Sequence, residues 1–351
     1  MKGVVLAGGA GSRLRPITFA MSKQLVPVAN QPILFYGLHD LAEAGITEVA
    51  IIISPETGRE IRDAVGDGSR FGIKPEFILQ DSPDGLAHAL QLAMPFADGD
   101  SVLMYLGDNL VRQGVADVVR DFEEHQPNAQ ILLATVPNPS AFGVAQLDDE
   151  GHVYQLIEKP ADPPTNLALV GVYLFDSTVQ EALDAIEPSD RGELEITDAI
   201  QYMIDSGRKV RASMIGGWWK DTGKKEDLLH ASELVLESLR TSLKGEVIDC
   251  RLRGEVQVGL GSKLVDCDII GPVVIGRGVE IERSTIGPNT TIGDGCRITD
   301  AVVRKSILME EVELTHWRLR DSLVGRRASI GGSAPPAFVE LTVGERSEII
   351  G

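Results

Sequence analysis

In the C-terminal third of the chain, apolar residues and glycines recur at every seventeenth position. The clearest units each place an apolar residue before a Gly-x-Gly corner, and they are Val258-Gly259-x-Gly261, Ile275-Gly276-x-Gly278 and Ile292-Gly293-x-Gly295. The same spacing separates the members of two apolar columns, which are Val247, Leu264, Ile281 and Ile298, and Leu252, Ile269, Ile286 and Val303. Several columns at one period predict a solenoid, because each coil of short strands adds apolar side chains to a continuous core and glycines to the corners.

The cysteines follow the same repeat. Cys250 and Cys267 share a column with Ser284 and Ala301, which predicts small core side chains, and the odd total of three argues against a disulfide framework. The spacing resembles that of the hexapeptide left-handed parallel β-helix, and this resemblance alone supplies the handedness. We expect such a domain over residues 244–351, acting as a structural or assembly module. The repeat decays after Met309, so the C-terminal end is expected to be a degenerate coil plus a tail.

Residues 1–243 follow a different rhythm, in which strand-like and helix-like segments alternate. Strands are predicted at residues 2–7, 48–53, 77–79, 101–106 and 130–136, and helices at 30–44, 86–97 and 115–125. This alternation predicts an α/β domain with a mostly parallel sheet and helices on both faces. Ligands bind at the carboxyl ends of strands in such sheets. The loops after residues 7, 79 and 106 are therefore expected to form the site.

The charge of the chain limits its partners. The chain has 33 Lys and Arg against 52 Asp and Glu, a net charge of −19, which excludes non-specific binding to nucleic acid or anionic lipid. A polyanionic substrate would need a few placed cations, backbone amides or a metal ion. Apolar runs such as residues 49–53 are far shorter than the roughly 18 residues of a membrane span, and the first 16 residues do not resemble a signal peptide. We expect a soluble cytoplasmic protein.

A glycine-rich loop follows the first predicted strand. Residues 6–16 read LAGGAGSRLRP, and glycines in this position let backbone amides close around phosphate oxygens. The loop is not a P-loop, because no Gly-Lys-Ser/Thr follows at the required spacing, and Leu14 replaces the last glycine of the dinucleotide fingerprint. It offers Arg13, and the following Lys23-Gln24-Leu25-x-Pro27 offers Lys23. These are two cations for a triphosphate.

This stretch resembles the signature of the sugar-1-phosphate nucleotidylyltransferases, which join a nucleoside triphosphate to a sugar 1-phosphate and release pyrophosphate. The resemblance covers residues 1 to about 232 and is strongest to members that use dTTP and glucose 1-phosphate. The repeat resembles the tail of the long variant from deoxysugar and antibiotic pathways. The resemblance implies a Rossmann-like catalytic domain over residues 1–243 and catalytic roles for Arg13, Lys23 and Lys159. It also implies nucleotide contacts from Leu6, Ala7, Gly8, Gly9, Gly11 and Arg13.

Gln80 opens the segment QDSPDGLAHAL at a predicted strand end. A side-chain amide can both donate to and accept from the edge of a pyrimidine, and Gly85 would leave room for a base. In the family that the chain resembles, this segment reads thymine or uracil, which implies nucleotide contacts from Gln80, Pro83 and Gly85. A helix N-cap formed by Ser82 or Asp84 is compatible with that role.

Two carboxylates are candidates for a metal site. Asp108 directly follows an apolar strand in Tyr105-Leu106-Gly107-Asp108-Asn109, and Asp221 lies in Trp218-Trp219-Lys220-Asp221-Thr222-Gly223. Two carboxylates with phosphate oxygens and water suit Mg²⁺, which prefers octahedral oxygen ligands. The resemblance assigns both residues to Mg²⁺ and Asp108 also to the nucleotide. The six histidines are scattered along the chain, so a zinc site is not expected.

The sugar-phosphate half of the site is implied by the resemblance rather than by residue type. Phe142-Gly143-Val144 and Glu158-Lys159-Pro160 resemble the segments in which a glycine amide and a Glu carboxylate hold sugar hydroxyls while Lys binds the phosphate. The family places further sugar or phosphate contacts at positions that correspond to Asn109, Val170, Arg191 and Trp219.

Two other functions are less compatible with the residues present. An acyltransferase in the repeat would need a histidine base, and the repeat region contains only His316. A binding-only paralogue is disfavoured because Arg13, Lys23, Asp108, Lys159 and Asp221 are all present. The same chemistry on another sugar or cyclitol phosphate, or with UTP, GTP or ATP, stays open. We expect the protein to form a homo-oligomer. Its expected partners are its two substrates, the nucleoside triphosphate and the sugar 1-phosphate.

Overall fold

The computed structural model describes residues 1–333 and 337–351. It separates into two compact units, one formed by Met1–Gly9 and Leu34–Asp221 and the other by Ala10–Ile33 and Thr222–Gly351. The second unit thus combines the C-terminal repeat with a short N-terminal segment that carries Arg13 and Lys23. The domain boundary predicted between residues 243 and 244 stays a prediction, which limited proteolysis of the native protein would test.

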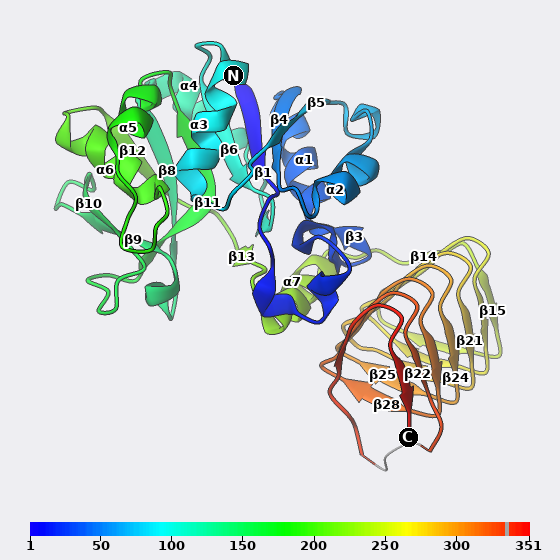
Figure 1. The fold of residues 1–351 in the computed structure, drawn as a ribbon. Coiled ribbons are helices and arrows are strands. Elements are labelled where there is room, and N and C mark those ends of the chain that lie inside the picture. Colours follow the sequence, from blue (N-terminus) through cyan, green and yellow to red (C-terminus); the bar gives the residue numbers. More distant parts are fainter. Residues whose placement is uncertain (334–336) are drawn as a thin grey trace. The chain divides into compact units, whose positions relative to one another are not determined.

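The first unit is built around one nine-stranded sheet (Figure 1). Its strands are β1 (Lys2–Leu6), β4 (Glu48–Ile53), β5 (Lys74–Leu79), β6 (Val102–Leu106), β8 (Ala129–Thr135), β9 (Gly143–Leu147), β10 (Val153–Glu158), β11 (Leu167–Phe175) and β12 (Val210–Met214). The order is β10-β9-β11-β6-β1-β4-β5, with β8 paired to β11 and β12. Strands β6, β1, β4 and β5 are parallel, as predicted, while β11 is antiparallel to β6 and β8. The carboxyl ends of β1, β5 and β6 therefore meet at one edge.

Helices cover both faces of this sheet (Figure 1). They are α1 (Ile33–Glu43), α2 (Gly58–Val65), α3 (Leu86–Ala97), α4 (Ala116–His125), α5 (Val179–Ala185) and α6 (Ile196–Asp205). Helices α3, α5 and α6 share one apolar core with the inward side chains of β1 and β4. On the opposite face, a Cβ at Gly3 would lie 3.2 Å from Leu41 of α1, which shows how closely that helix packs. Within residues 1–333 and 337–351, no helix is long and apolar enough to cross a membrane.

The predicted elements agree with the observed ones to within one residue, except that β5 begins at Lys74 rather than at residue 77 and α1 begins later than predicted. The strand predicted at 48–53 and the helix predicted at 86–97 have the observed bounds. Helix α1 begins at Ile33 rather than at residue 30, because β3 (Gln31–Pro32) pairs with β2 (Pro27–Val28) just before it. Gln31 and Pro32, which the predicted helix at 30–44 included, thus belong to this short hairpin.

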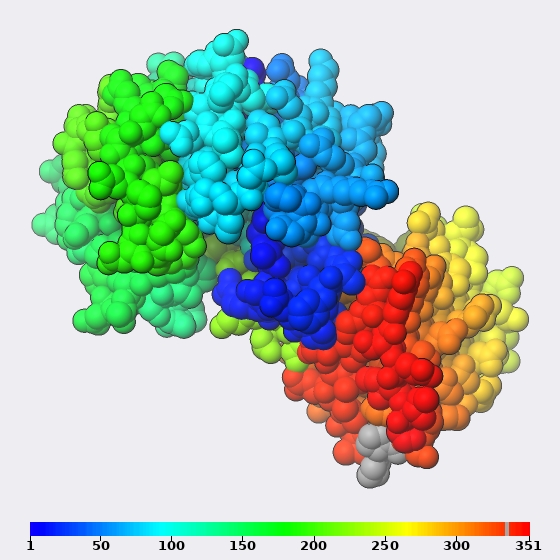
Figure 2. All heavy atoms as spheres, in the orientation of Figure 1, coloured from blue at the N-terminus to red at the C-terminus, as the bar shows by residue number. Residues whose placement is uncertain are grey.

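The repeat in the second unit forms parallel coils that stack in chain order, yellow to red in Figure 2. One sheet contains β14 (Ser242–Leu243), β17 (Val256–Val258), β20 (Val273–Ile275), β23 (Thr290–Ile292), β26 (Ile307–Leu308), β29 (Leu323–Val324) and β31 (Thr342–Val343). A second contains β15 (Glu246–Ile248), β18 (Lys263–Val265), β21 (Glu280–Glu282), β24 (Arg297–Thr299), β27 (Glu313–Thr315), β30 (Ser329–Gly331) and β32 (Glu348–Ile350). The third contains β16 (Arg251–Arg253), β19 (Asp268–Ile270), β22 (Thr285–Ile286), β25 (Val302–Arg304) and β28 (Arg318–Arg320). The three parallel sheets fit the predicted left-handed β-helix.

The strand register confirms the columns of the repeat. Successive register partners run from Val247 to Ile298 in one sheet and from Leu252 to Val303 in another. The three cysteines are free, as predicted. Burial raises the pKa of the Cys267 thiol to about 11, which suits a small core side chain.

The coils continue beyond the point where the sequence repeat decays. Arg297 pairs with Glu313 and Glu313 with Ser329, so each of these coils is one residue shorter than the coil from Glu280 to Arg297. The last pairing, from Ser329 to Glu348, spans a longer coil than any of these. Residues 342–350, where a tail was expected, therefore pair with the preceding coil in parallel strands. One residue fewer per coil moves every later residue out of its column, which hides the coils in the sequence.

The β-helix contacts both the N-terminal segment and α7 (Lys225–Leu236) within the second unit. The side-chain amide of Asn30 donates to the carbonyl of Ile292 over 2.6 Å. On α7, Glu233 accepts a hydrogen bond from Asn289 over 3.0 Å and pairs with Lys305 at 3.3 Å. These contacts join residues 10–33 and α7 to the middle coils.

Asn30→Gly is expected to lower the free energy of unfolding by about 1 kcal/mol, because it removes one hydrogen bond between the segment and a coil. Asn30 has φ +63, so Gly keeps the backbone conformation without adding strain. Ala29→Gly is the matched control, because Ala29 also has positive φ and is the preceding residue. Urea unfolding of the three proteins measures the difference. Equal loss in both variants would show that the Asn30 side chain contributes nothing.

Candidate active site

The loops after β1 and β5 meet at the carboxyl edge of the parallel strands. The amide of Ala7 donates to Ile52 and that of Gln80 to Ile53, so both chains extend the sheet ladder past the strand ends. A Cβ at Gly8 would lie 3.8 Å from Oε1 of Gln80. Leu6 and Ala7 are buried, so a ligand at this edge would meet their backbone rather than their side chains.

The side-chain amide of Gln80 is held by the start of α3. Its Nε2 donates to the carbonyl of Gly85 over 3.2 Å and lies 3.2 Å from Nδ1 of His88. His88 was not singled out from the sequence, because a lone histidine on a helix carries no recognisable signal. This arrangement fixes the direction of the Gln80 amide at the sheet edge.

Gly85 and Pro83 lie on the same loop, and Gly85 allows this loop to pack closely against the backbone of Leu194. It has φ +108, and a Cβ there would collide with the carbonyl oxygen of Leu194. The space beside Gly85 is thus filled by the Leu194 backbone, a reason for glycine that is independent of a base. The predicted side-chain N-cap of α3 is wrong, because Gly85 is the capping residue and the Ser82 hydroxyl bonds to Asp84 instead.

Asp108 and Asp221 lie on two segments that pair with each other. Strand β7 (Asn109–Val111) is antiparallel to β13 (Trp219–Asp221), and Asp221 is the register partner of Asn109, the residue after Asp108. The structure therefore brings the two predicted metal ligands together in the first unit, at the end of β6.

Asn109 is the hydrogen-bonding centre of this pair of strands. Its Nδ2 donates to Asp108 over 3.0 Å, and its Oδ1 accepts from the indole of Trp219 over 2.5 Å and from the amide of Gly171 over 3.2 Å. Asn109 is buried, as is Val170, the neighbour of Gly171 on β11. These bonds orient the Asp108 carboxylate and the Trp219 ring relative to β11. The sugar contacts predicted for Asn109, Val170 and Trp219 stay predictions.

A hydrogen-bonded pair between β6 and α1 was not predicted from the sequence. The phenol of Tyr105 on β6 donates to Asp40 of α1 over 3.0 Å. Burial raises the pKa of Asp40 to about 7, against a smaller lowering by the Tyr105 hydrogen bond. Gly37 lets the helix approach, because a Cβ there would lie 3.0 Å from the Tyr105 ring. The pair anchors β6 against α1, just before Asp108 in the chain.

The two sugar-phosphate segments predicted from the sequence lie side by side. Gly143 on β9 is the register partner of Glu158 on β10, and a Cβ at Gly143 would come within 2.7 Å of Thr197. Thr197 in turn donates to Glu158 over 3.3 Å. Lys159 follows with φ +41, a left-handed conformation that a lysine rarely adopts, and pairs with Glu158 at 3.1 Å. Gly143, Glu158 and Lys159 therefore form one group.

Arg191 neutralises a set of acidic groups at the same place. It pairs with Glu195 at 3.1 Å, with Glu193 at 3.0 Å and with Glu158 at 3.4 Å. Burial raises the pKa of the Glu195 carboxyl and that of Asp198. Glu195 and Thr197 were missed as members of the group, although both lie in the segment around Arg191 that the sequence marked.

Gly11, Arg13 and Lys23 belong to the second unit, where Gly11 packs against Lys23 and Arg13 lies beside Gly223. Gly11 has φ +61, and a Cβ on it would lie 2.8 Å from Cβ of Lys23. Lys23 is 8% exposed, which is unusual for a lysine. The guanidinium of Arg13 lies beside Gly223, where a Cβ would be 3.0 Å from Nη2. Gly11 and Gly223 thus make room for the two predicted phosphate-binding cations.

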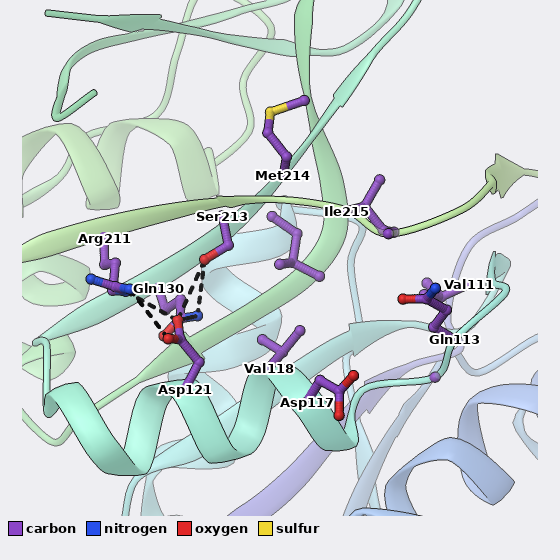
Figure 3. A pocket seen from close by; sticks show the side chains of 13 residues that line it. Val111, Gln113, Asp117, Val118, Asp121, Gln130, Arg211, Ser213, Met214 and Ile215 are labelled. Carbon is purple, nitrogen blue, oxygen red and sulfur yellow. Dashed lines mark hydrogen bonds and ion pairs between the residues drawn. The ribbon is translucent and has the colours of Figure 1, made fainter. Parts of the chain in front are cut away.

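Each of the two units contains a cavity with polar groups in its lining. In the second unit, a cavity of about 440 Å³ has four cationic residues in its lining, which are Arg13, Arg15, Lys224 and Lys225. In the first unit, a cavity of about 310 Å³ lies between α4, β8 and β12, where Asp121 accepts hydrogen bonds from Gln130 and Arg211 (Figure 3). The Arg211 hydrogen bond lowers the pKa of Asp121. No predicted site residue lines this second cavity.

Comparison with known proteins places the chain in a family. The family model described as nucleotidyl transferase matches residues 2–238. The chain is 48% identical to the low-salt glycan biosynthesis nucleotidyltransferase Agl11 of Haloferax volcanii, with 99% of each chain covered. It is also 48% identical to the glucose-1-phosphate thymidylyltransferase of Streptomyces antibioticus, again with 99% of each chain covered.

A solved structure agrees with these relatives. It is that of a Bacillus anthracis protein assigned as a glucose-1-phosphate thymidylyltransferase, 34% identical, with a TM-score of 0.64. The match covers 69% of this chain and 97% of that one. The sheet, the carboxylate pair and the full-length relatives thus lead to one assignment: the chain belongs to the nucleotidyl transferase family.

Proposed function

We propose that the protein transfers a thymidylyl group from dTTP to glucose 1-phosphate, forming dTDP-glucose and pyrophosphate. The observation that carries this proposal is the carboxylate pair, because the β7–β13 pairing brings Asp108 and Asp221 together at the end of β6. The loop that holds Gln80 begins at the same sheet edge, directly after β5. Full-length relatives named glucose-1-phosphate thymidylyltransferase, at 47% and 48% identity, support these substrates.

In the proposed reaction, a phosphate oxygen of the sugar phosphate attacks the α-phosphorus of the triphosphate. One P–O bond forms and the bond to the leaving pyrophosphate breaks. The attacking oxygen is already anionic, so no general base is needed. Catalysis then rests on positioning and on neutralising charge, which fits a site rich in glycine amides, lysine and arginine.

The carboxylate pair suits Mg²⁺. Among residues 1–333 and 337–351, no group of three or more His, Cys, Asp or Glu side chains could hold a metal ion. Two carboxylates are nevertheless enough, because Mg²⁺ commonly takes its other ligands from substrate phosphates and water. Asp108 and Asp221 would hold the ion, which when bound supplies a Lewis acid and a template at the α-phosphate.

The phosphate groups are assigned to the glycine loop and its cations. The amides of Gly8, Gly9 and Gly11 and the side chain of Arg13 would hold the leaving phosphates, and Lys23 would stabilise charge on the transferred group. Continuity along the chain supports this assignment, because Arg13 lies beside Gly223 and Gly223 closely follows Asp221 in the chain.

The sugar phosphate is assigned to the group around Glu158. Its carboxylate and the Gly143 amide would hold sugar hydroxyls, and Lys159 would bind the phosphate. Arg191, Val170, Asn109 and Trp219 would complete the contacts. The left-handed backbone of Lys159 supports this role, since strained backbone conformations of this kind gather at functional sites.

A second substrate pair has its own support. Agl11 of Haloferax volcanii, named for glycan biosynthesis, is as similar to the chain as the Streptomyces antibioticus enzyme. The same transfer onto another sugar or cyclitol 1-phosphate, or from UTP, GTP or ATP, is therefore the alternative. We further propose that the protein is a cytoplasmic homo-oligomer without a nucleic-acid partner, acting in nucleotide-sugar supply for deoxysugar or antibiotic synthesis.

Gln80→Ala is expected to flatten the choice among nucleotides more than it lowers the rate with the best one. The wild type should prefer dTTP, then UTP, because uracil keeps the hydrogen-bonding edge of thymine and lacks one methyl group, worth at most about 1 kcal/mol. CTP, ATP and GTP should be poor, since a mismatched polar group left unpaired costs about 1–3 kcal/mol.

The measurement is kcat/KM for the five triphosphates with wild type and variant. His88→Ala is a useful companion, because it removes the side chain beside Gln80 but leaves the amide. It should reduce selectivity less than Gln80→Ala does. A wild-type preference for GTP or ATP would overturn both the role of Gln80 and the thymidylyl assignment.

A further inference from the structure

Three arginines gather on the outer face of one β-helix sheet. Arg304 on β25 is the register partner of Arg320 on β28, and Arg318 precedes Arg320 by two positions on that strand. Val303, which precedes Arg304, and Leu319, which lies between Arg318 and Arg320, are fully buried in the coil core. The three arginine side chains therefore share the outer face, and we call them the arginine cluster.

One aromatic ring joins the arginine cluster. Val339 pairs with Leu319, which places Phe338 next to Arg318 on the same face. The guanidinium carbons of Arg304, Arg318 and Arg320 lie 5.3, 4.9 and 4.5 Å from the Phe338 ring centroid. Contacts of this kind are attractive and hold the planar guanidinium groups in fixed orientations.

The arginine cluster differs from most other arginines of the coils in that no described carboxylate balances its charge. Seven of those arginines pair with carboxylates, and they are Arg253, Arg277, Arg283, Arg297, Arg326, Arg327 and Arg346. Within the part of the chain that the structure describes, no carboxylate pairs with the cluster. Because Val339 pairs with Leu319, Glu340 is at the position next to Arg320 on the following coil, but its carboxylate pairs with Lys225.

A second observation points to a missing acceptor. The Nε atom of Arg304 is buried and has no hydrogen-bond partner among the described residues. Buried donors are normally satisfied, and an unsatisfied one in a native structure calls for an explanation. The chain as a whole carries a net charge of −19, so a group of three adjacent cations is contrary to its composition.

We propose that the arginine cluster binds a compact anion that carries a diphosphate group, through residues other than those assigned to catalysis. Guanidinium forks match phosphate oxygens two at a time, and the cluster is made of arginine alone. Its three charges converge on one ring, which matches a small, highly charged anion. An acidic peptide would spread its charges along a strand. This site goes beyond the proposed function, since none of the catalytic assignments includes these residues.

The test is calorimetric titration of the full-length protein with pyrophosphate in EDTA. Wild type is compared with Arg304→Ser/Arg320→Ser and with the single change Arg318→Ser at an exposed position. Arg251→Ser is the matched control, because Arg251 is an exposed arginine on β16 of the same sheet, with no acidic partner among the described residues. A Lys23→Met protein identifies any binding to the catalytic residues.

The expected result is a class of pyrophosphate binding that Lys23→Met keeps and that the double variant weakens at least about tenfold, the effect of losing one charged hydrogen bond or more. Arg318→Ser should weaken it also, and Arg251→Ser should leave it unchanged. Orthophosphate should bind more weakly than pyrophosphate. Titrations with dTTP and dTDP-glucose then distinguish free pyrophosphate from a nucleotide as the source of the diphosphate.

Several results would overturn the proposal. They are unchanged binding in the double variant, equal weakening by Arg251→Ser, equal affinity for orthophosphate, and cluster-dependent binding of an acidic peptide only. Turnover is measured separately on the same proteins. A protein that transfers no nucleotide but binds pyrophosphate through the cluster would contradict the proposed function and leave this inference standing.

Discussion

Asp108→Asn and Asp221→Asn are each expected to lower kcat by more than about 10³-fold while leaving the fold intact. Each change removes a charged oxygen ligand for a hard cation at nearly constant volume. A loss of this size corresponds to about 4 kcal/mol of transition-state stabilisation. The two carboxylates lie on paired segments, β7 and β13. Their losses should therefore be far from additive in the double variant, because removing either ligand already disables one shared site.

The measurement is turnover over a Mg²⁺ titration, with thermal unfolding to check the fold. Asp149→Asn is the matched control, because Asp149 is exposed on the β9–β10 turn of the same unit. It should keep the wild-type rate. Near wild-type turnover in either Asp108→Asn or Asp221→Asn would remove that residue from the metal site.

Lys23→Met is expected to lower kcat by at least about 10²-fold, the usual cost of losing one preorganised group that stabilises developing charge. Methionine keeps most of the side-chain volume at a position that is only 8% exposed and packed against Gly11. The loss should therefore reflect the ammonium charge rather than packing. Lys263→Met, an exposed lysine on β18, is the control and should have no effect. A rate within about twofold of wild type in Lys23→Met would exclude the assigned role.

Much of the fold could be predicted because its signals are local or periodic. The strand at 48–53 is an apolar, β-branched run, and α3 has a glycine before it and residues of high helix propensity within it. The columns from Val247 to Ile298 needed only a constant spacing. Where the coil became one residue shorter, from Arg297 to Glu313, the coils persisted and the sequence signal did not. The packed core accommodates a coil that is one residue shorter, whereas the spacing of apolar residues in the sequence loses its constant period.

The site was predictable only in part. The sequence placed Asp108 at a strand end, and the β7–β13 pairing then explains why Asp221 is its partner, a contact between distant parts of the chain that no local pattern contains. The Tyr105–Asp40 pair was invisible for the same reason. The glycine at position 85 was predicted from chemistry, yet its nearest neighbour is the Leu194 backbone. A residue type can be right while the contact that requires it is unknown.

The arginine cluster on the β-helix also could not be predicted from local sequence patterns. Arg304 and Arg320 are partners because the coil there is one residue shorter than the sequence period, and Phe338 joins them from the next coil. In the linear sequence these are isolated residues among many charges. Only the register brings three cations to one ring.

Pyrophosphate release on mixing the purified full-length protein with dTTP, glucose 1-phosphate and Mg²⁺ decides whether the chain is the transferase proposed. We expect release that requires all three components and yields one dTDP-glucose for each pyrophosphate. Replacing glucose 1-phosphate by other sugar or cyclitol 1-phosphates should lower the rate. Release without any sugar phosphate, or no release with any of the five triphosphates and any sugar 1-phosphate, would contradict nucleotidyl transfer by Asp108, Asp221 and Lys23.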